Sequence, residues 1–210
     1  MALPIARLSY ENLRSTANTF LKTHCPGEIP VPIEEIVEFK FGINVIPIPG
    51  LLEIHEVDAF VSQDLKTIMV DNSVMESHSP NRYRFSLAHE LAHVILHAEV
   101  FSAVRFTSLG QWRKLLASFP EEDRSWLEWQ AHGLAGLVLV PGDCLSREVR
   151  GAVTAARKRG VKLLGNEDVA KAYISTHLGR VFEVSAEVIN RRMDKDNLWP
   201  PEGRLALPHK

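Results

Sequence analysis

The 210-residue sequence is poor in cysteine, with only Cys25 and Cys144, which lie far apart and form no CxxC motif. This scarcity argues against a disulfide framework and against a zinc site built from thiolates. Long apolar runs are also missing, because the longest, residues 134–141, is far too short to span a bilayer. The first residues lack a charged stretch followed by an apolar one. No signal peptide is therefore predicted, and a cytoplasmic protein without membrane contact is expected.

An excess of charge of one sign is also missing, since 24 Lys+Arg against 26 Asp+Glu leave a net charge of −2. The chain lacks the basic excess typical of nucleic-acid binding, so direct DNA binding is not expected. The GxGxxG, Walker and GxSxG motifs are absent, which leaves nucleotide binding and serine hydrolysis without support. With 45% hydrophobic and 24% charged residues, the composition is globular.

The spacing of apolar residues predicts an α+β protein. Helices are expected over residues 10–23 and 33–39, followed by three strands over residues 43–48, 57–62 and 67–70. The last two strands flank a short polar segment and predict a hairpin, so the sheet is expected to be small and antiparallel. Further helices are predicted from Ser79 to about Ala98 and over residues 111–118, 120–140, 143–159, 167–178 and 185–194. Strands and helices do not alternate, which excludes a doubly wound sheet.

An HExxH motif, His89-Glu90-x-x-His93, stands inside one of the predicted helices. Histidines four positions apart lie about 40° apart around a helix axis and about 6 Å apart along it, so both can reach one metal ion. Glu90 is rotated by about 100° from His89 and lies beside the metal. There it can take a proton from the attacking water and return it to a leaving amine. The motif therefore predicts Zn2+, one per chain, with Glu90 as the catalytic residue.

The alternative is that such a short pattern arises by chance and that the two histidines are ordinary surface residues. Apolar residues, however, surround the motif on nearly every side of the helix: Ala88, Leu91, Ala92, Ile95 and Leu96. The helix is therefore expected to be buried, where unpaired histidines and a glutamate are costly. A bound metal accounts for all three polar residues at once.

A catalytic zinc needs a third protein ligand. The HExxHxxGxxH extension fails, because Leu96 and Glu99 stand at the Gly and final His positions. His97 lies about 9 Å along the axis from the midpoint of the histidine pair, which favours a packing or substrate-side role. Glu128 and His132 share one face of a later helix. Glu128 is favoured as the ligand, with His132 orienting a ligand, but the reverse assignment stays open.

These motifs resemble those of the ImmA/IrrE-type zinc metallo-endopeptidases, over about residues 10–195. That family reads RFTLAHELGH where residues 84–93 here read RFSLAHELAH. Its second motif, Glu-x-x-Ala-Asn-x-Phe-Ala-Ala followed by Leu-Leu-Met-Pro, matches residues 128–136 and 138–141, with His132 in place of the usual Asn or Asp. The resemblance implies an α+β, zincin-like fold with a small antiparallel sheet packed on the HExxH helix and a helical C-terminal part. It also implies Glu128 as third ligand, a gluzincin-like set.

Members of this family act in bacteria and phages, where they cleave helix-turn-helix repressors encoded beside them. The resemblance implies a zinc-dependent endopeptidase whose protein substrate is such a transcriptional repressor. The alternative is a non-proteolytic binding regulator of a repressor or of a toxin–antitoxin partner. The intact Glu90 argues for chemistry, since a pure binder needs no general base. A DNA-binding accessory role is disfavoured by the net charge of −2.

Three regions are predicted: a metallopeptidase domain over residues 1–142, a helical C-terminal region with a helix-turn-helix-like pattern over 143–198, and a loose tail over 199–210. Six basic residues between positions 147 and 162 are interpreted as a solvated helix face. The strand Thr67–Val70 is expected to be an edge that aligns the substrate by backbone pairing. The candidates for stabilising the oxyanion are Tyr83, His97, Tyr173 and His177.

Overall fold

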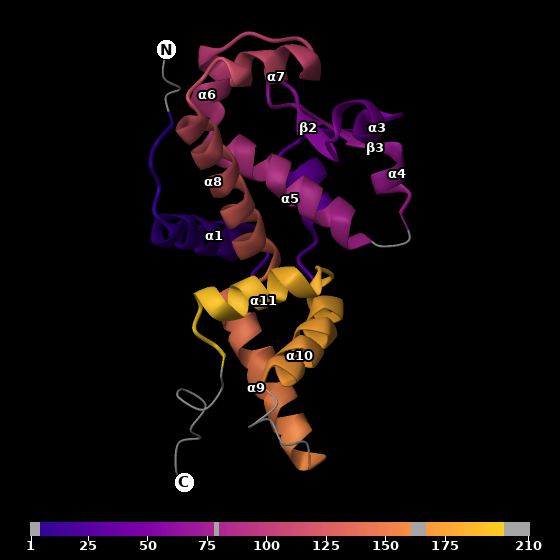
Figure 1. Ribbon diagram of the computed structural model, residues 1–210, viewed down its shortest axis with the longest axis vertical. Helices are drawn as coiled ribbons and strands as arrows, with labels where there is room; N and C mark the ends of the chain where they lie inside the picture. The colour runs from indigo at the N-terminus through magenta and orange to yellow at the C-terminus, as the bar shows by residue number, and fades with distance from the viewer. Residues whose placement is uncertain (1–4, 78–79, 161–166, 200–210) are drawn as a thin grey trace.

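The computed structural model describes residues 5–77, 80–160 and 167–199 of the chain. Two long helices, α5 (Pro80–Leu96) and α8 (Glu121–Leu139), cross near the centre and form the most extensive contact between elements (Figure 1). A three-stranded sheet packs on α5, and α1 (Tyr10–His24) packs on α8. Three helices at one end of the molecule complete the fold: α9 (Gly142–Lys158), α10 (Glu167–Phe182) and α11 (Ala186–Lys195).

Helix α1 shows how local sequence determines an element here. Its N-terminus is a capping box, in which the Ser9 side chain accepts from the Asn12 backbone and the Asn12 side chain accepts from the Ser9 backbone. The predicted apolar stripe is buried, and consists of Leu13, Ala17, Phe20 and Leu21. Because these residues recur at helical spacing, they present one continuous face to α8.

The sheet is mixed, in the order β1 (Asn44–Ile48), β3 (Thr67–Asp71), β2 (Ala59–Val61). The predicted hairpin is confirmed, since β2 and β3 are antiparallel. The prediction of a wholly antiparallel sheet is wrong, because β1 runs parallel to β3. After β1 the chain passes through the short helix α3 (Leu51–His55), and β2 then adds to the far side of β3 rather than to β1.

The strand at residues 67–70 is therefore central, and its expected role as an edge is wrong. Strand β3 has a hydrogen-bonded neighbour on both sides, and its Ile68 and Val70 are fully buried. The free edge that lies beside α5 belongs to β2. Sequence pattern marks both strands of the hairpin as apolar but does not say on which side a third strand adds.

The predicted helix from Ser79 to Ala98 is divided in the structure. Helix α5 ends at Leu96, and α6 (Ala98–Ala103) begins after His97, whose φ of −122° and ψ of 16° lie outside the helical range. Ser79, the expected cap of α5, lies outside the described residues. The break matters because it leaves the His97 ring at the end of the helix that carries the HExxH motif.

The remaining helices agree with prediction in position but not always in form. The helix expected over residues 33–39 is a short α-helix followed by a π-helical turn. Two further helices, of five and four residues, were not predicted, because such short segments show no clear hydrophobic periodicity. The further elements are α2 (Ile33–Glu35), η1 (Ile36–Lys40), α4 (Asn72–Met75) and α7 (Leu109–Ala117). In the described part of the chain, no helix is long and apolar enough to cross a lipid bilayer.

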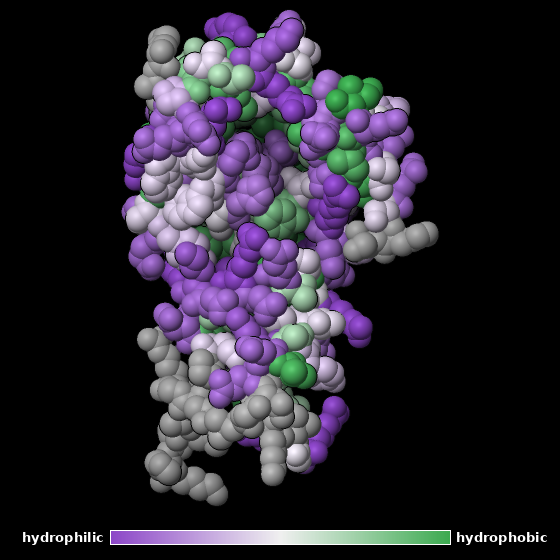
Figure 2. All heavy atoms as spheres, in the orientation of Figure 1, coloured by the Kyte–Doolittle hydropathy of each residue, from purple (hydrophilic) through white to green (hydrophobic). Residues whose placement is uncertain are grey.

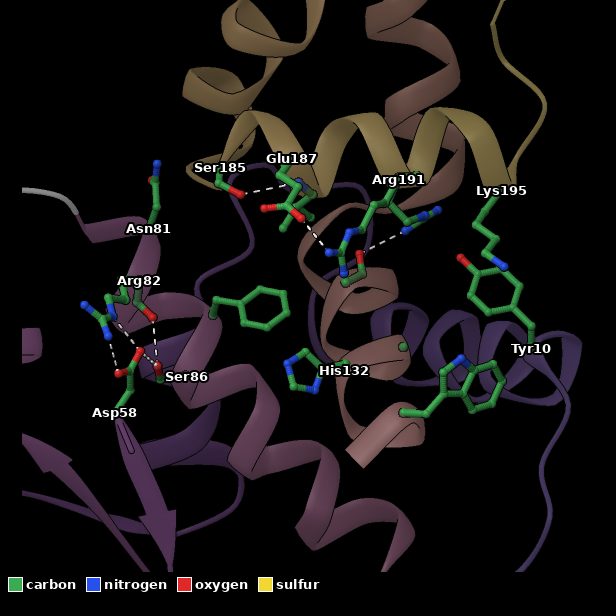
Figure 3. Close-up of a pocket in the computed structure, with 16 residues that line it drawn as sticks. Tyr10, Asp58, Asn81, Arg82, Ser86, His132, Ser185, Glu187, Arg191 and Lys195 are labelled. Atoms are coloured by element: carbon green, nitrogen blue, oxygen red, sulfur yellow. Dashed lines mark hydrogen bonds and ion pairs between the residues drawn. The ribbon is translucent and has the colours of Figure 1, made fainter. Parts of the chain in front are cut away.

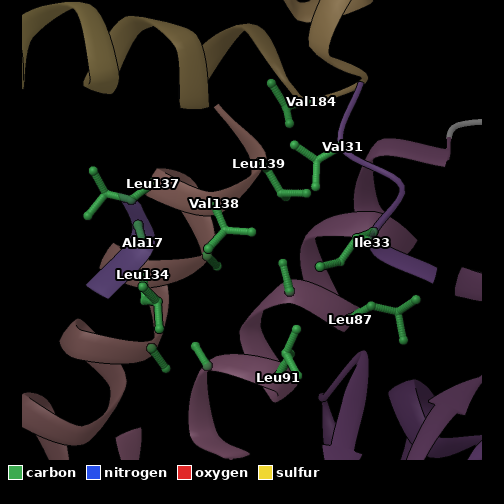
Figure 4. Packing of buried hydrophobic residues seen from close by; sticks show 14 of the residues in the cluster. Ala17, Val31, Ile33, Leu87, Leu91, Leu134, Leu137, Val138, Leu139 and Val184 are labelled. Carbon is green, nitrogen blue, oxygen red and sulfur yellow. The ribbon is translucent and has the colours of Figure 1, made fainter. Parts of the chain in front are cut away.

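The hydrophobic core lies between α5, α8 and their neighbours. Leu87 and Leu91 of α5 and Leu134 of α8 lie together in Figure 4, and none of the three is more than 1% exposed. Burying one leucine side chain contributes about 1.5–3 kcal/mol. Val184, which follows α10, belongs to the same cluster. The two helices that build the candidate site are therefore fixed relative to one another by close packing.

Arg192 of α11 attaches the C-terminal helices to the end of α8. Its side chain is 4% exposed, donates to the carbonyls of Gly136 and Val140, and pairs with Asp196 at 2.8 Å. Val140 directly follows α8, and the Gly136 carbonyl also accepts from the Val140 backbone N–H, so Arg192 binds the C-terminal end of this helix. The division at residue 142 stays a prediction, and of the expected tail only Trp199 lies among the described residues.

Candidate metal centre

Helix α5 brings the two histidines of the HExxH motif together. Their Nε2 atoms lie 3.1 Å apart, and their rings meet edge to face with centroids 4.8 Å apart. His93 is 5% exposed. Burial, and then the neighbouring His89, hold the pKa of His93 well below its usual value, so this imidazole is neutral. A neutral imidazole is the form that coordinates a metal ion.

Helix α8 adds a carboxylate to this pair. Glu128 Oε2 lies 3.2 Å from His89 Nε2, and Glu128 Oε1 lies 3.9 Å from His93 Nε2. Burial raises the pKa of Glu128, but the hydrogen bond with His89 and the other nearby histidines outweigh burial and lower it to about 2. Tetrahedral zinc ligands at about 2.0–2.1 Å from the ion lie about 3.3 Å from one another. The three donors therefore fit zinc in type and spacing.

His132, one turn after Glu128, also reaches the centre. Its ring meets the His89 ring edge to face at 4.4 Å, and one ligand atom each from His89, Glu128 and His132 lie within 4.8 Å of one another. Its Nδ1 lies 3.1 Å from the carbonyl oxygen of Glu128, so the ring is tethered to its own helix. Two overlapping donor sets therefore share His89 and Glu128 and differ in whether His93 or His132 completes them.

Glu90 lies beside this group and outside it. The side chain is 7% exposed, and its Oε2 accepts a hydrogen bond of 2.9 Å from the backbone N–H of Val61 in β2. Burial raises the pKa of Glu90 to about 7. A carboxyl with this pKa exchanges its proton readily near neutral pH, as a general base that later acts as an acid requires. The Val61 contact was missed by sequence reasoning, because it depends on the pairing of β2.

His89 differs from its partner in two respects. Burial lowers its pKa, but the hydrogen bond with Glu128 and the charges of Glu90 and Glu128 outweigh burial, so the pKa is raised. Its Nδ1 is buried and has no hydrogen-bond partner among the described residues. The Nε2 atom thus makes every polar contact of this ring, with His93 and Glu128.

Two cavities adjoin the centre. The smaller, about 160 Å³, is lined by His89, Glu90, His93 and Glu128, by strand β2, and by apolar residues that include Phe101 and Trp112. In Figure 2 this face of the molecule is hollowed below α7, with hydrophobic atoms at the bottom. The larger, about 590 Å³, lies on the other side of His132, between α5, α8 and α11 (Figure 3).

Three other residues that the sequence suggested for the site lie outside the lining of the two cavities. His97 and Tyr83 line neither of these cavities. Burial, with the charges of two nearby glutamates, raises the pKa of Tyr83 to about 12. His97 is 2% exposed and contacts His93 and Gln130. Tyr173 is 71% exposed on α10, and it lines neither cavity.

Comparison with known proteins gives one family. The model of the IrrE N-terminal-like domain, Peptidase_M78, matches residues 40–194. A solved structure of a Mycobacterium tuberculosis transcriptional regulator is similar, with a TM-score of 0.50 and 19% sequence identity over 86% of this chain and 46% of that chain. This chain thus spans less than half of that regulator, and the likeness concerns the fold alone. No curated protein matches the chain.

The helical body with its small mixed sheet agrees with this match, and the expected α+β, zincin-like fold is confirmed. The matched family is one of metallopeptidases. Because the matched residues make up more than half of the sequence, the chain belongs to the Peptidase_M78 family of IrrE N-terminal-like domains, as its resemblance to the ImmA/IrrE group predicts.

Proposed function

We propose that this protein is a zinc-dependent endopeptidase, with His89, His93 and Glu128 as ligands and Glu90 as general base. One observation carries the proposal: three donors spaced 3.1–3.9 Å apart adjoin a buried carboxyl whose pKa is about 7. Two neutral or readily neutralised imidazoles and one carboxylate form a common catalytic zinc set that leaves a fourth position open.

Zinc, when bound, polarises the carbonyl of the scissile bond and lowers the pKa of a coordinated water to about 7. The residues of this protein move the proton. Glu90 accepts a proton from the attacking water and passes it to the leaving amine. The backbone N–H of Val61 holds one carboxyl oxygen of Glu90, so the other oxygen is left to exchange the proton. A correctly placed base of this kind typically contributes 10²–10⁴-fold in rate.

The edge of β2 supplies a way to align an extended substrate. In the antiparallel pairing with β3, Phe60 lies opposite Met69, and Ser62 N donates to Thr67 O. The backbone groups of Ala59 and Val61 therefore face away from β3. The N–H of Val61 is taken by Glu90, which leaves the N–H and C=O of Ala59 and the C=O of Val61 for a substrate strand. An extended peptide added here would lie beside the metal centre.

The substrate we propose is a helix-turn-helix transcriptional repressor encoded near this protein, cleaved in the cytoplasm. The support is the resemblance to the ImmA/IrrE-type endopeptidases, with which a solved structure named a transcriptional regulator is compatible. The site is narrow, since the cavity at the metal centre has a volume of about 160 Å³. A narrow site favours one flexible segment of a specific partner over general digestion.

The experiment is cleavage of the helix-turn-helix protein encoded by the neighbouring gene. Purified protein loaded with zinc should convert this partner into two fragments whose masses add up to the intact chain and one water. The Glu90→Gln variant and the chelated protein serve as controls and should produce no fragments. A stable complex without fragments would instead identify a binding regulator, and the absence of both complex and fragments would refute the proposed partner.

A further inference from the structure

A buried chain of hydrogen bonds leads away from the metal centre. His93 Nδ1 lies 3.0 Å from His97 Nδ1, and His97 Nε2 lies 3.3 Å from Gln130 Oε1. Gln130 Nε2 in turn donates to the backbone carbonyl of Ala6 at 2.8 Å. His97 and Gln130 are 2% and 1% exposed. The chain thus joins α5, α8 and the segment before α1, and none of its side chains faces bulk water.

The Ala6 end of this series of hydrogen bonds determines which atom donates and which accepts at each step. The Ala6 carbonyl can only accept, so the amide nitrogen of Gln130 faces Ala6 and its oxygen faces His97. That oxygen also only accepts, so His97 carries its proton on Nε2. In a neutral imidazole the other nitrogen is an acceptor, and His97 Nδ1 therefore accepts from His93 Nδ1–H. The lone pair of His93 is then on Nε2, the atom that faces His89 and Glu128.

We propose that His97 and Gln130 are positioning residues that hold His93 in the tautomer that binds metal through Nε2. The inference rests on the proposed zinc site, and it gives His97 a role different from the packing or substrate-side role that its sequence position favours. Partners of this kind fix the ring orientation and the tautomer of metal-binding histidines.

The two histidines of the motif differ in the hydrogen bonding of their Nδ1 atoms. His89 Nδ1 is buried and has no hydrogen-bond partner among the described residues, so nothing comparable orients that ring from behind. Of the two rings, His93 is therefore the one that is oriented by a hydrogen bond on the side away from the metal centre. Loss of the His97 contact should weaken metal binding, because that contact is the hydrogen bond that the structure gives to His93 Nδ1.

The test compares two variants of the same shape. Asn and Leu branch alike, but only Asn places an acceptor oxygen near the position of the His97 Nδ1 atom. His97→Leu should weaken zinc binding about 10–100-fold, and His97→Asn should bind zinc within about threefold of the wild type. Ser175→Ala, which removes a buried hydroxyl of α10, is the control for general destabilisation and should leave zinc affinity unchanged. Equal weakening in the Leu and Asn variants, or none in either, would overturn the proposal.

A second readout needs no metal and no activity. Nitrogen-15 NMR of the chelated protein should show His93 protonated on Nδ1 in the wild type and in His97→Asn, and a mixture of tautomers in His97→Leu. His97 itself should carry its proton on Nε2 and lose this preference in Gln130→Leu. A wild-type His93 protonated on Nε2 would refute the inference. Failure of the wild type to bind zinc would refute the proposed function, while the tautomers would still test the chain of hydrogen bonds.

Discussion

Replacing Glu90 by glutamine separates three properties that we propose for this residue: it supports the fold, it does not bind the metal, and it acts as the general base. The amide has the same shape as the carboxyl, and its oxygen can still accept from Val61 N–H, so the fold should be kept. In the described part of the chain the polar contact of Glu90 is with Val61 and not with the three proposed ligands, so zinc content should be unchanged. Peptide-bond cleavage should fall by at least about 10²–10⁴-fold, because the amide cannot accept the proton from the attacking water.

The size of the effect of this substitution on the stability of the metal-free protein follows from the pKa of Glu90. Burial raises the pKa of Glu90 from 4.5 to about 7, which corresponds to about 3 kcal/mol at about 1.4 kcal/mol per pKa unit. Because the folded state holds this proton more tightly than the unfolded state, the wild type loses this stability as the pH rises from about 4.5 through about 7. Glu90→Gln has no such proton. The variant should therefore become the more stable protein above pH 7, by up to about 3 kcal/mol.

The assay is urea unfolding of both chelated proteins at several pH values between 4 and 9. The difference in the free energy of unfolding isolates Glu90, since the other titrating groups are common to both proteins. It should grow steadily between pH 4.5 and 7 and then level off. A difference that does not change with pH would contradict the buried environment of Glu90. Cleavage at the wild-type rate by Glu90→Gln would mean that another residue is the base.

Three further changes test the ligands and the fold. His93→Ala should lose most of the zinc that the wild type holds at about one per chain, as metal analysis would show; full zinc content in a variant lacking both His89 and His93 would refute the site. Arg192→Met should cost about 1–3 kcal/mol in unfolding free energy, because it removes hydrogen bonds to two carbonyls while Asp196 keeps its second partner, Arg14, at 2.7 Å; an unchanged free energy of unfolding would contradict the attachment that Arg192 makes. Gly179→Ala should lower the melting temperature, because a Cβ would lie 2.8 Å from a backbone oxygen of Val184, whereas an unchanged melting temperature would show that this turn adjusts freely.

What the sequence predicts well is local. The HExxH helix, the α1 stripe and helix α8 each follow from apolar residues at helical spacing within one segment, and the structure places these helices within a few residues of the predicted bounds. The contact between His89 and His93 has the same origin, because residues four apart on a helix always share a face.

What the sequence does not predict is set by distant pairings. The Val61 contact that holds Glu90 exists only because β2 lies at the edge of the sheet, and the addition of β1 to β3 determines that edge. The hydrogen bond from Gln130 to Ala6 spans 124 positions. No periodicity within one segment carries such information, so the partners of the proposed catalytic and ligand residues are seen only in the fold.

The third ligand is the point that spacing alone leaves open, since Glu128 and His132 are one turn apart on the same face of α8. The carboxylate of Glu128 lies 3.2 Å from His89 Nε2, whereas His132 is held by its Nδ1 to a backbone carbonyl of its own helix. Glu128→Ala should therefore empty the site and abolish cleavage. His132→Asn can keep the bond to that carbonyl and should cost at most about 10–100-fold in zinc affinity. Zinc content and partner cleavage measured in both variants decide whether Glu128 or His132 is the third ligand beside His89 and His93. If His132→Asn emptied the site while Glu128→Ala retained zinc, His132 would be the ligand, and the assignment of His89, His93 and Glu90 would stand without Glu128.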